Sequence, residues 1–561
     1  MLVPLFFLLV FFFYPLTSIF ERSFVQDGQL ALGAFRDLAQ SDYYRETLWF
    51  TTWQAALSTA LTLGLAIPGA HVFARYEFPA KRMILALATL PFVLPTVVVA
   101  AAFIALFGPN STLNTALMAV LGRETPPLAL RNTLTIILLA HVFYNYAVAL
   151  RIISSYWANQ HPRIEQAAQV LGATPARVFW HITLPLLSPA IAAAGALVFV
   201  FTFTSFGVVL LLGGVQYATL EVEIYQQTTA FLDLGTAGAL SVVQLLATLA
   251  MMVVYTSIQR GVTRRGSGSI GRAQTRRPQR FGEWVWLGLN LLLIALLIFA
   301  PLVALVERSF LVGVSQPTTL YYESLSETSR NSILFVPPEA AIYNSLRYAV
   351  IAMTAALILG TLAAYLLNRR GRLSAWLDPL IMLPLATSAV TLGFGFLIAL
   401  DGQGAVHDAL RGLLNTDESP LNLRDSFWIV PIAHTLVAMP FVVRSVLPTL
   451  RRIDPTIKEA AAVLGASAWG RWWRIELPLI SRSLLVGATF AFTISMGEFG
   501  AAVFIARFDE PTMPIVIARL LGQPGVANYG QALAMSVLLM LVCMAGFLLI
   551  ERLNRDVVGE F

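Results

Sequence analysis

The sequence predicts an all-α polytopic membrane protein, built from two tandem six-helix repeats with about 12 transmembrane helices. Hydrophobic residues make up 57% of the 561 residues and charged residues only 12%, about half the charged share of an ordinary soluble domain. Apolar stretches of about 20 residues, the length that crosses a hydrocarbon core, recur along the chain. From Tyr343 onward, the second half repeats the first at a constant spacing of 293 residues. Six spans per half make the repeats parallel, related by a pseudo-twofold axis along the membrane normal.

The first repeat is expected to comprise residues 1–258. Its predicted spans lie near residues 2–20, 50–74, 83–107, 133–157, 186–212 and 238–258. We interpret the first span as retained, because no charged region precedes it and no clear small-residue cleavage site follows it. Pro91 and Pro95 fall inside the third span. Prolines are tolerated there when neighbouring helices take up the freed carbonyl groups.

A basic linker is expected at residues 259–282. It contains seven arginines with glycine and serine between them, and it has no acidic residue. This pattern is typical of a solvated segment near anionic lipid headgroups, which makes membrane lipid a predicted partner. Nucleic acid is not a predicted partner, because no aromatic residues interleave with the arginines to stack on bases.

The second repeat, residues 283–561, restates the first. Its predicted spans lie near residues 284–306, 344–367, 375–400, 427–447, 479–506 and 529–551. His434 repeats His141, Arg444 repeats Arg151, and Phe499-Gly500 repeats Phe206-Gly207. The arginine-rich turns, the linker and the C-terminal Arg552 and Arg555 all fall on one side by span count. The positive-inside rule assigns this side to the cytoplasm, with both termini cytoplasmic and the chain in the cell membrane.

Two polar loops, residues 161–185 and 454–478, interrupt the hydrophobic pattern on that same side. Aligned without a gap, 13 of the 25 positions in 164–188 match 457–481. Each loop has an Ala-rich helical turn that runs up to a glycine, Gly172 or Gly465, where a left-handed backbone costs little. A second short helix follows and is predicted to stop at Leu184-Pro185 or Leu477-Pro478.

Several catalytic and metal-binding classes are excluded by composition. The only lysines, Lys81 and Lys458, lie outside any Gly-rich phosphate-binding loop, so ATP hydrolysis is not expected on this chain. The six histidines form no ligand-spaced pair, and the single cysteine, Cys543, lies in an apolar run. We therefore predict no catalytic residue and no metal site. An ion-coupled secondary transporter is the alternative, but paired ionisable residues near the midplane are not evident.

The two loops resemble the cytoplasmic EAA loop of permease subunits of ABC importers. That pattern is Glu-Ala-Ala, three residues, Gly, nine residues, then Ile-x-Leu-Pro. The first copy departs from it, because Gln166 takes the glutamate position and Glu165 comes one residue early. The resemblance implies that a homodimeric ATPase subunit docks on both loops, and that ATP and Mg bind that partner, with no cofactor on this chain. The residues that match the coupling loop are Gln166, Ala167, Ala168, Gly172, Leu184, Pro185, Glu459, Ala460, Ala461, Gly465, Leu477 and Pro478.

Almost the whole chain resembles the fused permeases of the ferric-iron and thiamine importer group. The stretches that carry this resemblance are 203–207, 212–214, 219–221, 495–500, 511–514 and 528–532. The resemblance implies a permease that takes ferric iron or thiamine from an extracytoplasmic binding protein by alternating access. Permeases for polyamine or for sulfate and molybdate are the alternatives.

Glu498 is the candidate pathway residue. It is expected toward the outer end of the eleventh span, and its counterpart in the first half is Ser205. A carboxylate inside a span costs several kcal/mol, roughly 2.5–3.5 on translocon-based scales, unless it faces water or a partner. Two interpretations stay open: a structural hydrogen bond, or a pathway position that favours a cationic solute.

Overall fold

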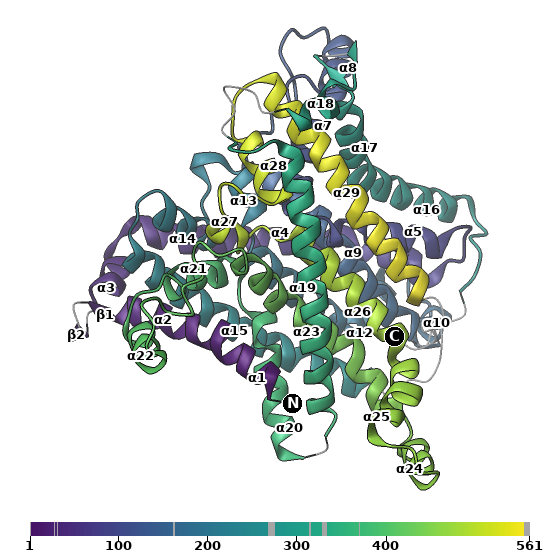
Figure 1. The fold of residues 1–561 in the computed structure, drawn as a ribbon. Helices are drawn as coiled ribbons and strands as arrows, with labels where there is room; N and C mark the ends of the chain where they lie inside the picture. The colour runs from purple at the N-terminus through teal and green to yellow at the C-terminus, as the bar shows by residue number, and fades with distance from the viewer. Residues whose placement is uncertain are drawn as a thin grey trace.

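The computed structural model describes residues 2–26, 29–30, 32–160, 163–266, 275–313, 316–327, 334–369 and 371–554, and it is almost entirely helical (Figure 1). In these ranges the strands are limited to two short antiparallel hairpins. One joins β1 (Val25–Gln26) to β2 (Gln29–Leu30), and the other joins β3 (Leu311–Val312) to β4 (Gln316–Pro317). The all-α prediction is confirmed.

The membrane-spanning helices agree with the predicted number. Within the described ranges, eleven helices are long and apolar enough to cross a membrane, or twelve if one sharply bent pair is a single span. In the first half they include α1 (Val3–Leu8), η1 (Leu9–Phe13) and α2 (Tyr14–Phe24) as one span, then α4 (Asp42–Arg75), α7 (Thr96–Phe107) with α8 (Thr112–Leu121), α9 (Leu134–Ala158), α12 (Leu184–Phe203) and α15 (Leu234–Gly266). In the second half they include α16 (Phe281–Ile294), η4 (Ala295–Phe299) and α17 (Ala300–Ser309) as one span, then α19 (Pro338–Leu367), α20 (Arg372–Ala386) with α21 (Ala389–Ala399), α23 (Ile429–Arg452), α26 (Leu477–Gly497) and α29 (Val526–Asn554).

Shorter helices occupy the connections. They are α3 (Gly33–Gln40), α14 (Leu220–Thr229), α18 (Leu320–Glu323), α22 (Ala405–Leu414) and α28 (Met513–Leu521), with the 3-10 turns η3 (Gly214–Gln216) and η5 (Ser324–Ser326). The predicted domain limits at 258 and 283 stay a prediction.

The third and ninth spans are broken, and the third candidate span, Thr96–Leu121, lies further along the chain than the predicted 83–107. Residues 81–107 form α5 (Lys81–Leu87), α6 (Leu90–Val93) and α7, and α20 meets α21 at an angle of 95°. Proline cannot donate the backbone hydrogen bond that continues a helix. Pro95 therefore precedes α7, and Ser388 at the matching place caps α21 with its side chain. The two inner helices that result are among the most deeply buried parts of the molecule.

The fifth and eleventh spans also end earlier than predicted. α12 stops at Phe203 and a short helix, α13 (Gly207–Leu212), resumes after a break. α26 stops at Gly497 and α27 (Ala502–Ile505) follows after an equivalent break. The apolar composition continues through both breaks, so the hydrophobic pattern alone extended the predicted helices.

Four prolines inside long helices are accommodated by π-helical turns. The turns η1, η2 (Phe179–Thr183), η4 and η6 (Trp472–Glu476) each end two residues before a proline: Pro15, Pro185, Pro301 and Pro478. The wider turn relieves the clash between the proline ring and the carbonyl four residues earlier. The predicted stop at Leu184-Pro185 and Leu477-Pro478 was therefore wrong. Each short loop helix, α11 (Pro175–Val178) or α25 (Ala468–Arg471), runs on through a π-turn into the next span.

The first span of each half packs on the other half. α1 and α2 contact α19 and α21, while α16 and α17 contact α4 and α7. Gly395 of α21 has room only for a hydrogen on this side, since a Cβ would lie 3.2 Å from Pro15 and Ile19 of α2. Because each first span packs on the other half, the two repeats share one packed interior.

Candidate functional site

Each polar loop turns at a left-handed glycine, as predicted. α10 (Arg163–Val170) ends before Gly172, which has a φ of +87°, and α24 (Pro455–Val463) ends before Gly465, which has a φ of +82°. The next amide closes the turn in both copies, from Ala173 N to Ala168 O at 3.0 Å and from Ala466 N to Ala461 O at 2.9 Å. This pattern is a Schellman motif, which satisfies carbonyls at a helix end and needs the left-handed residue.

The tip of each loop presents uncovered apolar side chains. Val170 and Leu171 are each 88% exposed, and their repeat counterparts Val463 and Leu464 are each 87% exposed. In Figure 1, α24 and α25 project from the body at the lower right. Two matching apolar tips, each next to polar helix faces, are typical of a protein interaction site.

Each loop is closed on itself by a polar contact between equivalent positions. In the first copy, Glu165 accepts a hydrogen bond from Thr183 Oγ1 at 2.9 Å and pairs with Arg75 of α4. In the second, Lys458 pairs with Glu476 at 3.2 Å. Residues 165 and 183 correspond to 458 and 476 at the 293-residue spacing, so the same link is made with different chemistry. This link was not predicted from the sequence, because it joins the two helices of each loop across the glycine turn.

The residues of the predicted coupling loops divide by exposure. Glu459 and its counterpart Gln166 are both exposed, so the departure in the first copy changes a solvent-facing side chain. The remaining positions are exposed or half-buried at both loops: Ala167, Ala168, Leu184, Pro185, Ala460, Ala461, Leu477 and Pro478. The twelve residues therefore lie at the surface of the two loops, six on each.

The second loop has additional features at its ends. Asp454 accepts a hydrogen bond from Thr456 N at 2.9 Å, which caps α24 and lowers the pKa of the Asp454 carboxyl. The equivalent position, His161, lies outside the described residues. Trp469 also stacks on Trp472 with ring centres 5.0 Å apart. The position that matches Trp469 in the first copy is Ala176, so the two loops differ in aromatic content.

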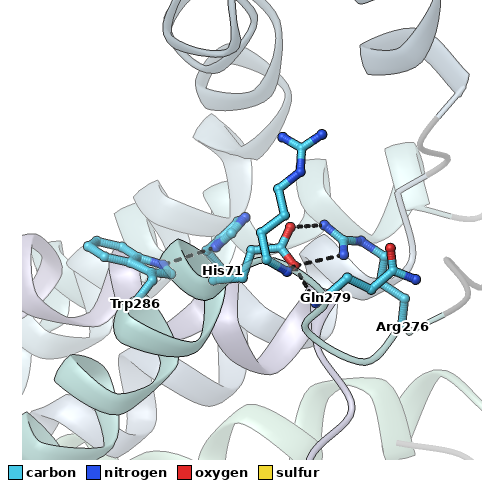
Figure 2. Close-up of polar contacts among 6 residues, drawn as sticks. His71, Arg276, Gln279 and Trp286 are labelled. Atoms are coloured by element: carbon cyan, nitrogen blue, oxygen red, sulfur yellow. Dashed lines mark hydrogen bonds and ion pairs between the residues drawn. The ribbon is translucent and has the colours of Figure 1, made fainter.

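The end of the basic linker is docked, although the whole segment was predicted to be solvated. Its residues 267–274 lie outside the described part of the chain. Beyond them, Arg276 pairs its backbone with the end of α4, from Arg276 N to Arg75 O and from Glu77 N to Arg276 O. The Arg276 guanidinium donates two hydrogen bonds to the Glu283 carboxylate. Nearby, Trp286 Nε1 donates to His71 Nδ1 at 3.3 Å (Figure 2). The linker thus joins the start of the second half to the C-terminal end of α4.

Two repeat-equivalent phenylalanines meet between the halves. The rings of Phe206 and Phe499 stack with centres 5.5 Å apart and planes 22° from parallel. Residues related by the 293-residue repeat can touch only where the pseudo-twofold axis passes. Tyr225 packs edge-on against Phe206 and also against Phe504, which extends the cluster. Phe206 and Phe499 are 7% and 3% exposed, so the axis is closed at this level.

The glycine after each phenylalanine permits close helix packing. A Cβ on Gly207 would lie 2.3 Å from Thr96 Oγ1, and a Cβ on Gly500 would lie 2.9 Å from the Ala389 side chain. Thr96 and Ala389 are the first residues of α7 and α21. The Phe-Gly pairs therefore sit against the broken third and ninth spans, which hold the stacked rings in place.

Ser205 and Glu498 precede these phenylalanines and bind equivalent histidines. Ser205 Oγ lies 2.9 Å from His141 Nε2, and Glu498 Oε2 lies 3.4 Å from His434 Nε2. Glu498 also accepts hydrogen bonds from Ala501 N at 2.8 Å and Ala502 N at 2.9 Å. Glu498 was expected within a helix, but it lies in the break after α26 and is 7% exposed. The hydrogen bonds of Glu498 are thus to the backbone that directly follows it, and its role stays a prediction.

We expect Glu498→Gln to destabilise the fold without changing transport per folded molecule. The glutamine amide nitrogen cannot accept a hydrogen bond, so a buried backbone N–H at the break loses its acceptor, at a cost of about 1–3 kcal/mol. Thermal unfolding and uptake normalised to folded protein are the measurements. Ser205→Ala is the matched change and should cost less, because Ser205 has no such pair of amide partners. A fall in normalised uptake at unchanged stability would instead place the charge in the pathway.

A second buried carboxylate joins the halves. Glu221 of α14 accepts hydrogen bonds from Ser388 Oγ at 2.6 Å and from Gln244 Nε2 at 2.9 Å. Ser388 caps α21 of the other half, so this contact crosses the interface. Among the residues that the structure describes, no group of three or more His, Cys, Asp or Glu side chains is arranged to hold a metal ion.

Comparison with known proteins matches this architecture. Residues 60–267 and 356–559 each match the family of binding-protein-dependent transport system inner membrane components. The thiamine transport system permease protein of Salmonella typhimurium is 27% identical over 93% of this chain and 91% of its own length. The Escherichia coli protein of the same name is 26% identical over 92% and 90%.

Half-length proteins are also similar. A putative 2-aminoethylphosphonate transport system permease protein of Salmonella paratyphi A is 27% identical and aligns over 46% of this chain and 89% of its own. A further match is a chain from the crystal structure of a bacterial ABC transporter involved in the import of the acidic polysaccharide alginate. The alignment covers 46% of this chain and 92% of that chain. It has 19% identity and a TM-score of 0.37. Because the family matches cover most of the chain in two copies, the protein belongs to the binding-protein-dependent transport system inner membrane components, as a fused two-repeat permease of an ABC importer.

Proposed function

We propose that this permease moves thiamine, delivered by an extracytoplasmic binding protein, into the cytoplasm. The observation that carries the proposal is the pair of thiamine permeases that align over at least 90% of both chains. Half-length permeases for other solutes align with only one repeat, whereas the thiamine relatives share the fused arrangement. Ferric iron is the competing substrate.

The proposed energy source is a separate homodimeric ATPase that docks on both loops. The support is the pair of apolar tips, which are matched in sequence, turn geometry and exposure. A homodimer presents two identical surfaces, which fits two equivalent loops. We also propose that the loops, the linker and both termini face the cytoplasm, on the strength of the arginine distribution.

In the proposed mechanism, motion of the docked ATPase passes directly into the spans. Each short loop helix is continuous with the following span through its π-turn, so a tilt of the loop tilts α12 or α26. Those helices end at the breaks that carry Ser205-Phe206 and Glu498-Phe499. Separation of the stacked phenylalanines would then open the axis. In this mechanism the permease alternates between a closed and an open state, and each state is favoured by a different partner.

The test is uptake of labelled thiamine in cells that lack their own thiamine importer. The chain is expressed with the ATPase and binding protein encoded beside it, and each component is omitted in turn. We expect saturable uptake that needs all three proteins and that unlabelled ferric iron and sulfate do not compete. Uptake of ferric iron instead would replace the substrate, and thiamine uptake without the ATPase would favour an ion-coupled transporter.

A further inference from the structure

A basic pocket lies beside the second loop. One cavity of about 740 Å³ is lined by residues that include Arg369, Arg451 and Lys458, and an adjoining cavity of about 480 Å³ is lined by residues that include Arg444. The two cavities share Arg451 and Asp378, so they form one continuous pocket between the ends of α19, α20 and α23. Among the described residues that line the two cavities, Asp378 is the only acidic one. The excess of positive charge favours an anionic occupant.

The arginines of this pocket are exposed and lack acidic partners. Arg369, Arg444 and Arg451 are all exposed, and among the described residues none of the three forms an ion pair. Lys458 is already paired with Glu476. The pocket therefore offers guanidinium groups whose donors are available, and guanidinium geometry suits a phosphate group.

The equivalent place in the first half is filled, and of the pocket's cations only Arg444 has a basic counterpart there, the half-buried Arg151. Arg369, Arg451 and Lys458 correspond to Tyr76, Ala158 and Glu165 at the 293-residue spacing. There, Arg276 of the linker lies over the Tyr76 ring at 5.4 Å and pairs with the backbone on either side. In the first half, the linker thus fills the place that corresponds to the pocket. In the described part of the other half it stays open and basic.

The wall of the pocket above the arginines is apolar. Pro379 and Met382 of α20 face Val443, Leu447 and Pro448 of α23 across the smaller cavity. Both helices belong to membrane spans, so this wall continues from the polar end of the spans toward the hydrocarbon region. A molecule with a phosphate at one end and acyl chains at the other matches both parts of the pocket.

We propose that this pocket binds the phosphate headgroup of an anionic phospholipid, next to the second docking loop and not the first. Lys458 belongs both to the pocket and to α24, so a bound headgroup lies against the base of that loop. The site is independent of the solute that the permease carries. Its occupancy ties the position of the second loop to the lipid composition of the membrane.

The test measures lipid association with the full-length protein in nanodiscs. Spin-labelled phosphatidylglycerol is compared with spin-labelled phosphatidylcholine by the immobilised fraction at increasing label concentration. We expect the wild type to prefer phosphatidylglycerol and the variant Arg444→Gln/Arg451→Gln to lose that preference, by about fivefold for each arginine removed. The control Arg82→Gln/Arg177→Gln removes two exposed arginines from the first half on the same side and should keep the preference.

A second arm separates the lipid from soluble phosphate. Inorganic phosphate is added at millimolar concentration to the same nanodiscs, with chloride at equal ionic strength as the control. We expect phosphate to displace no more phosphatidylglycerol than chloride does. Displacement specific to phosphate would assign the pocket to a soluble anion and overturn the lipid. Equal binding of the two lipids, or equal loss in both double variants, would overturn the pocket altogether.

Discussion

Replacing Gly465 by valine is expected to abolish ATPase association and reduce uptake to background, while the chain still inserts and folds. Gly465 has a φ of +82°, and a Cβ there would meet no atom within 4 Å. The effect therefore comes from the backbone alone. A left-handed conformation costs an L-residue about 1–2 kcal/mol, and a β-branched residue is among the least tolerant. Relaxing toward negative φ breaks the bond from Ala466 N to Ala461 O and turns the Val463-Leu464 tip away. Co-purification with the ATPase and uptake in cells are the measurements.

Gly465→Asn is the matched control, because asparagine adopts the left-handed conformation more readily than other non-glycine residues. It should retain most of the association and transport. Gly172→Val should have the same direction of effect as Gly465→Val, since its φ is +87° and its surroundings are equally open. Normal association and transport by Gly465→Val would mean that the loops are not the docking elements.

Removing both stacked rings is expected to make the permease leak. In the variant Phe206→Ala/Phe499→Ala, the contact that closes the axis is lost from both halves at once. We expect release of thiamine trapped in proteoliposomes to rise at least tenfold without ATP or binding protein. Each single variant should leak less, because the remaining ring still covers part of the opening. The release rate, measured with the purified chain, reports the barrier directly.

A matched control is needed because Phe→Ala changes in a core cost about 3–5 kcal/mol each. Phe103 and Phe143 provide one. Their rings pack edge to face with centres 5.5 Å apart, and both residues belong to the first half. Phe103→Ala/Phe143→Ala should lower stability to a similar degree and keep the liposomes tight. A leak of equal size in both double variants would show that general loosening, and not an opening on the axis, causes the release.

The span number and the loop turns could be predicted because they depend on short stretches of sequence. A bilayer requires about 20 apolar residues per crossing, and each such stretch can be recognised without reference to the rest of the chain. Likewise, Gly172 and Gly465 each end an Ala-rich helix, where the left-handed turn is a local backbone property. The repeat then placed both loops on one side, although the 293-residue spacing says nothing about what they contact.

The helix breaks could not be predicted from hydrophobicity, because residues on both sides of each break are apolar. At 204–206 the Thr219 hydroxyl donates to the Ser205 carbonyl, and at 498–501 the Glu498 carboxylate accepts from two amides. These polar contacts satisfy the backbone that an unbroken helix would have satisfied itself. The π-turns before Pro185 and Pro478 are the converse case. There, proline predicted an end, but the chain kept its helix by widening one turn.

The sequence by itself determined that this chain spans a membrane, that it is one unit repeated, and that two matching loops turn at glycines. Those properties follow from the length of apolar stretches and from backbone sterics, which act over a few residues. Only the tertiary structure decided that the first span of each half packs on the other half, that Phe206 meets Phe499, and that the Glu498 carboxylate is committed to amides and His434. Those contacts join residues that are distant along the chain, and the physical reason is that close packing and hydrogen-bond satisfaction are decided by three-dimensional proximity.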